Sequence, residues 1–152
     1  MSEHMPDNVQ VVSSLLQAQW ASFISSPGIS AIFWPTTKPD VAQFDSQPFN
    51  YVVACYNPGS PAAVDDSAQG VWTIVEDIIV DILIKVGSGT EQNAIDTREA
   101  LRQAIYSIIH HNETTISGIN EAHISRETYK VESPQHMRLA MLVKCKYFHL
   151  KT

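Results

Sequence analysis

The sequence predicts a single α+β domain in which a mostly antiparallel sheet packs with two helices. In residues 69–86, β-branched side chains recur on one parity, which is typical of a strand. Segments 8–24 and 90–111 carry apolar residues at three- and four-residue spacing, which is typical of amphipathic helices. The run 135–148 alternates apolar and basic residues, as a half-buried strand does.

The composition is that of one ordered globular domain. The chain has 152 residues, 44% of them hydrophobic and 17% charged, and shows no repeat or second domain, so we expect one domain over 1–152. We find no secretion signal at the N-terminus and no apolar run of membrane-spanning length. Cys55 and Cys145 lie in strand-like runs, so we expect buried free thiols in a reducing compartment.

The long run at 69–86 is expected to form the centre of the sheet, either as one bent strand or as two strands that meet near Glu76 and Asp77. The even parity, which should face the core, carries Ile74, Ile78, Val80, Ile82, Ile84 and Val86, whereas the odd-numbered residues mix apolar and charged side chains. We expect another subunit to cover part of that second face. One core should contain nine residues of this run, the second helix and the last strand: Ile78, Val80, Ile82, Leu101, Ile105, Ile108, Leu139, Met141 and Val143.

Shorter elements flank this framework. Strands are expected at 29–34, 50–56, 114–119 and 123–131. Prolines recur in 36–48, which predicts a loop or a brief turn. Residues 57–68 are small and rich in Pro and Gly, which predicts a flexible loop, either a simple connection or a functional one.

The second helix has two possible starts, Thr90 or Asp96, because Asp96 and Glu99 fit a capping box. Its predicted buried stripe contains Ala94, Leu101, Ile105 and Ile108. Asn112 follows the last turn, where a left-handed residue often closes a helix, so we expect that conformation there.

Charge is unevenly distributed. The net charge is −6, which disfavours general affinity for nucleic acid. Residues 1–119 carry a net −9 and residues 120–152 a net +3, so an acidic front and a basic tail can satisfy each other within a subunit or between copies. The interface candidates are Asp65, Asp66, Asp77, Asp81, Arg138, Lys144 and Lys146.

Strand parity suggests how these charges pair. Asp77 and Asp81 should face Arg138, Lys144 and Lys146, because both sets lie on the non-core parity of their strands. For the same reason we expect them outside the core. His136 shares the parity of Arg138, which predicts a solvated side chain.

Catalytic motifs are not found in the sequence. It has no nucleophile elbow, phosphate loop, dinucleotide fingerprint or zinc signature, so we expect no enzyme activity, no cofactor and no metal. The adjacent His110 and His111 should point in different directions at a helix end, which is unfavourable for a shared metal. The carboxylates Glu76, Asp77 and Asp81 lie on a rigid element, but acid–base work would require a pocket around them.

The order of the segments is informative. An N-terminal helix leads to residues 32–35 and then to a strand at 51–56. A loop of small residues then leads through 69–72 into the long apolar strand. A helix containing 98–105 and a final strand at 137–147 complete the chain. In this order and rhythm, over most of its length, the sequence resembles the tail terminator (tail completion) proteins of long-tailed bacteriophages.

The resemblance implies a structural role. A tail-terminator-like α+β subunit would close into a hexameric ring that caps the tail tube, stops its polymerisation and binds the head–tail connector or neck protein. Genomic DNA would pass through the lumen without specific binding, and no membrane would be involved. The protein would be made in the host cytoplasm and reside in the tail or neck of the virion.

Two alternatives remain open at this point. One is another neck protein, such as a head-closure (stopper) protein. The other is a small cytosolic enzyme or ligand-binding protein, which would be a monomer or dimer with a deep pocket near residues 76–81.

Overall fold

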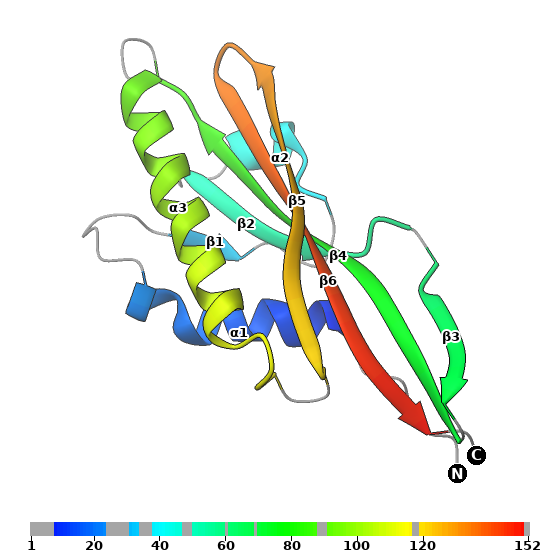
Figure 1. The fold of residues 1–152 in the computed structure, drawn as a ribbon. Helices are drawn as coiled ribbons and strands as arrows, with labels where there is room; N and C mark the ends of the chain where they lie inside the picture. The colour runs from blue at the N-terminus through cyan, green and yellow to red at the C-terminus, as the bar shows by residue number, and fades with distance from the viewer. Residues whose placement is uncertain are drawn as a thin grey trace.

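A fifteen-residue strand, β4 (Val71–Lys85), lies at the centre of the sheet in the computed structural model (Figure 1). The structure describes residues 8–23, 31–33, 38–46, 50–59, 61–68, 70–87, 91–116 and 119–150. Within these ranges the other elements are α1 (Asn8–Phe23), β1 (Ala31–Phe33), α2 (Val41–Asp45), β2 (Tyr51–Tyr56), β3 (Ala63–Ala68), α3 (Glu91–His111), β5 (Glu121–Ser133) and β6 (His136–Leu150).

The sheet is mostly antiparallel, as predicted. Among the described residues it has six strands in the order β1-β2-β4-β6-β5, and β3 also pairs with β4. Only the β1–β2 pair is parallel. The strand expected at 69–86 is therefore one strand rather than two, and the predicted α+β fold is confirmed.

The β4–β6 pair is the longest in the fold. It is in register from Val71 opposite Leu150 to Lys85 opposite His136, a length of about 50 Å at roughly 3.3 Å per residue. Figure 1 shows its lower end, with β3 beside it, extending past α1. We call this extension, residues 63–68, 71–75 and 146–150, the arm.

The core lies between this sheet and the helices α1 and α3. All nine residues that the sequence assigned to one core belong to a single buried cluster. The apolar stripes of the two helices face it, with Val12, Leu16 and Trp20 from α1 and Leu101 and Ile105 from α3. Cys55 and Cys145 are buried free thiols in the same cluster. Alternating apolar residues thus placed the core face of β4 and β6 correctly.

Two predicted loops contain regular structure. Residues 63–68 form β3 rather than part of a flexible loop, because the open edge of β4 offers backbone partners at Val75, Ile74 and Thr73. Residues 41–45 form the short helix α2, which buries Phe44 against Val52 and Leu83. In both places tertiary contacts override a composition that is unfavourable for regular structure.

The helix α3 ends at His111, as predicted, and of its two predicted starts the one at Asp96 is wrong. The helix is already formed at Glu91, and Asp96 is an interior residue whose carboxylate accepts a hydrogen bond from Gln92 at 2.9 Å. Asn112 has no left-handed backbone. Instead its side-chain amide donates to the Ile108 carbonyl and to Gln19 of α1, both at 2.8 Å, so Asn112 ties the end of α3 to α1.

The strand predicted at 114–119 is wrong over its described residues. Residues 112–116 form turns, which bury Ile116 and Ile119 at the edge of the core. The two isoleucines are three apart, and a turn brings both to one side, whereas a strand would place them on opposite faces. The predicted ends at residues 24, 29, 34 and 90 lie outside the described residues.

Truncation of a core residue tests which face of β4 is buried. We expect Ile82→Ala to lower the free energy of unfolding by about 2–4 kcal/mol, because Ile82 is fully buried and the space left behind cannot close completely. Val131→Ala is the matched control, since Val131 is 63% exposed. Urea unfolding measures both. Equal losses in the two variants would contradict the assigned face.

Candidate functional site

The second face of the sheet carries most of the predicted interface residues. We call it the outer face; it bears the odd-numbered residues of β4 and the even-numbered residues of β6. Asp77, Asp81, Arg138, Lys144 and Lys146 all lie on it. Asp65 joins them, because it is opposite Thr73 in the β3–β4 pair and opposite residues share a face. The side chain of Asp66 lies outside what the structure describes.

A buried ion pair occupies one half of this face. Arg138 Nη1 donates to both carboxylate oxygens of Asp81 at 2.8 Å. The Tyr56 hydroxyl donates to Asp81 at 2.7 Å, and Arg138 donates to Glu132 at 2.6 Å and to the Pro39 carbonyl at 3.1 Å. Asp81 is completely buried and Arg138 nearly so. Both lie outside the main core, as expected, but they are buried on the outer face, and their predicted pairing is present within one subunit.

The segment 38–46, which contains the unpredicted helix α2, lies against this part of the face, and its Pro39 carbonyl accepts from Arg138. Phe44 packs on Leu83 of the outer face, and its ring stands edge-on to His136 with centroids 6.3 Å apart. His136 Nε2 lies 2.6 Å from Asp45 Oδ1, and its Nδ1 lies 2.8 Å from the Ser133 hydroxyl. The prediction that His136 is solvated is wrong for the same reason, since it is only 5% exposed.

Burial and hydrogen bonds in this network shift the pKa values of Tyr56 and Glu132. Burial, followed by the hydrogen bond to Asp81, raises the pKa of Tyr56 well above its ordinary value, so the hydroxyl stays a donor. The hydrogen bond from Arg138 holds the pKa of Glu132 below its usual value. Arg138 thus pairs with two carboxylates, and one of them, Glu132, also lies 3.7 Å from Lys130 Nζ, which makes this half of the face a structural centre of paired charges.

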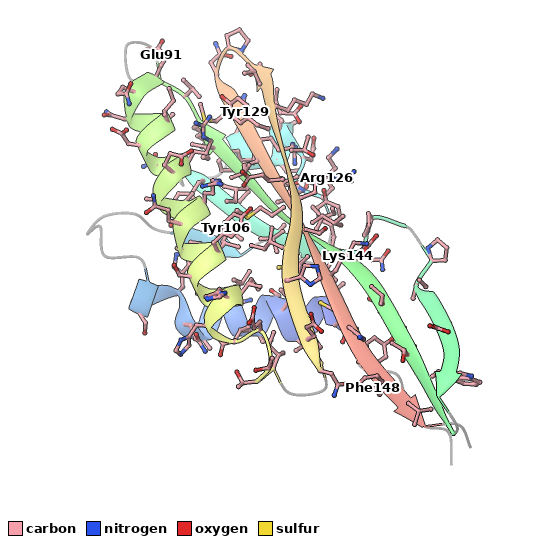
Figure 2. All side chains as sticks on the ribbon, in the orientation of Figure 1. Glu91, Tyr106, Arg126, Tyr129, Lys144 and Phe148 are labelled. Atoms are coloured by element: carbon pink, nitrogen blue, oxygen red, sulfur yellow. The ribbon has the colours of Figure 1, made fainter. Side chains whose placement is uncertain are left out.

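The other half of the outer face is open. Lys144 Nζ lies 3.3 Å from Asp77, and both side chains are partly exposed, so this predicted pair is also formed within one subunit. Lys146 has no acidic partner in this half; its ammonium lies 5.9 Å from the ring centroid of Phe148. Figure 2 shows Lys144 and Arg126 on neighbouring strands, and Phe148 towards the end of the arm. Apolar and basic side chains are therefore exposed side by side.

The geometry offers little for small-molecule chemistry. No group of three or more His, Cys, Asp or Glu side chains among the described residues is placed to hold a metal ion. A hollow of about 560 Å³ lies between the start of α3 and the end of β4, and it is lined by Asn50, Lys85, Asn93 and Gln135 among others, but not by residues 76–81. In the described part of the chain, no helix is long and apolar enough to span a membrane.

Comparison with known proteins gives one informative result. No family model and no curated protein matches the sequence. The fold is similar to that of a chain in the virion of a native gene transfer agent particle. The TM-score is 0.54 at 15% sequence identity, and the alignment covers 91% of this chain and 92% of the virion chain. At this identity the similarity is one of fold, extending over the whole subunit.

The sequence pattern did not identify Tyr56, Glu132 and the segment 38–46 as parts of the buried network. Parity alone could not identify them, because what covers a sheet face depends on contacts between segments distant in the chain. Phe44 gave a weak signal, since it lies three residues after Val41, the spacing of a short helical face.

Replacing the buried Arg138 should lower the free energy of unfolding far more than replacing the partly exposed Lys144. We expect Arg138→Met to lower the free energy of unfolding by about 3–5 kcal/mol, because it leaves the Asp81 carboxylate buried without a cation. In the control Lys144→Met, loss of the exposed pair with Asp77 should cost about 0–1 kcal/mol. Urea denaturation compares the two. Similar costs would contradict the assignment of Arg138 as a structural centre.

Glu132 should make stability depend on pH. Its folded pKa is lower than its ordinary value of 4.5, so its contribution is present above that value and is lost as the pH falls through the lowered pKa. We therefore expect Glu132→Gln to be less stable than the wild type at pH 7, with the difference shrinking as the pH approaches 3. Unfolding free energies across this range measure it, with the exposed Glu121→Gln as control. A difference that stays constant would contradict the argument.

Proposed function

We propose that this protein is a structural component of a virion and, within it, the tail terminator that ends the tail tube. The observation that carries the proposal is the fold similarity to a chain of a gene transfer agent virion, which covers nearly all of both chains. A match of this extent concerns a whole subunit rather than a motif that many folds share. The resemblance in segment order to phage tail terminators supports the specific role.

The surface favours assembly into a ring. The open half of the outer face and the arm expose apolar and charged side chains together, including Phe148 at 52% and Val64 at 58%. The acidic front and the basic tail of the chain give opposite charges to different regions. Contacts between two different surfaces of identical subunits close into a ring when the rotation between neighbours allows it. We propose a hexamer whose faces bind the tail tube protein and the head–tail connector.

The charge of the chain suits passage of DNA through such a ring. With a net charge of −6, the protein attracts the phosphate backbone little, so DNA would slide past without being held. A structural role of this kind requires no catalytic group or cofactor.

Loss of the gene tests the role. In cells that produce the particles, we expect deletion to yield heads and separate tails of excessive, variable length, because nothing stops polymerisation of the tube. Electron microscopy of lysates measures tail lengths, and the gene supplied in trans should restore normal particles. Full heads that leak DNA, with tails of normal length, would identify a head-closure protein instead. Normal particles without the gene would overturn both roles.

A further inference from the structure

Besides β1, which pairs only with β2, two described strands have an open edge. β5 pairs only with β6, and β3 pairs only with β4, among the strands the structure describes. An open edge presents unpaired backbone N–H and C=O groups, which can accept a strand from another chain. The edges of β3 and β5 lie on opposite sides of the sheet, β3 within the arm and β5 on the side of α3 (Figure 1).

Each of these two edges has an exposed charged residue with no partner found among the described residues, an acid on β3 and a base on β5. Asp65 on β3 is exposed, and no hydrogen bond or ion pair to a described residue is found for it; the same holds for Arg126 on β5. The neighbouring acids of β5 are already engaged, because Glu127 pairs with Arg102 at 2.8 Å and Glu132 pairs with Arg138. Arg126 therefore remains an uncompensated positive charge on its edge.

Exposed apolar residues mark the same strands. The large hydrophobic side chains that are exposed in the described residues are Val64 on β3, Tyr129 and Val131 on β5, and Phe148 at the end of β6. Figure 2 shows Tyr129 and Phe148 towards opposite ends of the sheet. A contact that buries both regions must join different surfaces of two copies.

We propose that β3 of one copy pairs with β5 of the next copy, with Asp65 beside Arg126, so that the sheet continues around the ring. This inference rests on the ring assembly proposed above and names its contact. The strand directions support it: β3 and β6 each run antiparallel to β4, and β5 runs antiparallel to β6. In copies that share one orientation, β3 and β5 thus meet as an antiparallel pair, the kind that hairpins and meanders use.

The position of the two residues fixes a stagger. Across the sheet, Asp65 of β3 lies opposite Thr73 of β4. Arg126 of β5 lies opposite Leu142 of β6, which in turn lies opposite Ile79 of β4. Thr73 and Ile79 are six residues apart on β4, a distance of about 20 Å along the strand. Neighbouring copies must therefore be offset along the strands, and strands tilted to the axis supply such an offset in closed sheets.

Register irregularities make the pairing selective. β5 is regular between the shift at Ile124 and Arg126 and the shift at Val131 and Ser133, and β3 has its own shift after Asp65. Such irregularities prevent indiscriminate edge pairing. The regularly paired segments of β3 and β5 are short, so the match between Asp65 and Arg126 determines which segments of the two strands can pair.

Cysteine cross-linking tests the contact. In the variant with Asp65→Cys and Arg126→Cys, we expect mild oxidation to give a ladder of covalent oligomers on a non-reducing gel. Cys55 and Cys145 should stay silent, because both are buried and burial raises the pKa of each thiol to about 12. The control variant carries Asp65→Cys and Ser107→Cys and should give no ladder. Ser107 is an exposed residue of α3 and does not belong to β5.

Light scattering measures how reversing these charges changes the oligomeric state. Asp65→Arg should reduce the oligomeric fraction severalfold, and adding Arg126→Asp in the same chain should restore it. A wild-type ring that yields no ladder from the Asp65 and Arg126 cysteines overturns this contact but leaves the proposed function standing. Equal ladders from the test and control variants, or a chain that stays monomeric without cross-links, also overturn it. The tail-length experiment decides the function independently.

Discussion

The antiparallel pairing of β4 with β6 is the constraint on which the other features depend. Because fifteen residues of each strand stay in register, one parity of both strands faces α1 and α3 along the whole length, and the other parity forms the outer face. A slip of one residue would exchange the two faces and expose Ile78, Ile82 and Met141. The same length carries the sheet beyond the helices, so the arm follows directly from the extent of this pairing.

The outer face divides into two halves with different roles. Where the segment 38–46 covers it, charged groups are buried in pairs, since Asp81 pairs with Arg138 and Arg138 pairs with Glu132. Where nothing in the described chain covers it, Lys144 and Lys146 stand among apolar side chains. Charges of the first kind are buried within one subunit, whereas those of the second kind stay partly exposed, although Lys144 also pairs with Asp77. The sequence shows both kinds on one parity, and only the tertiary structure separates them.

The sequence sufficed for features set by local periodicity. The core of β4, α3 and β6 was predicted residue by residue, because alternation and helical spacing directly express which side is buried. Features set by distant contacts were missed. β3 forms because it pairs with the edge of β4, and α2 forms because Phe44 packs against Leu83 and Val52. The local composition of these segments does not indicate either partner. The pairing of Asp77 with Lys144 was predictable from parity, whereas the burial of Arg138 depended on the missed α2.

The central claim is that the subunit is built into a virion at the end of the tail tube. Its most direct test is the location of the protein in purified particles, with the chain carrying a gold-labelled C-terminal tag and viewed by electron microscopy. The account predicts label concentrated at the junction of head and tail. Label along the tail or over the head, or particles that contain none of the protein, would contradict it.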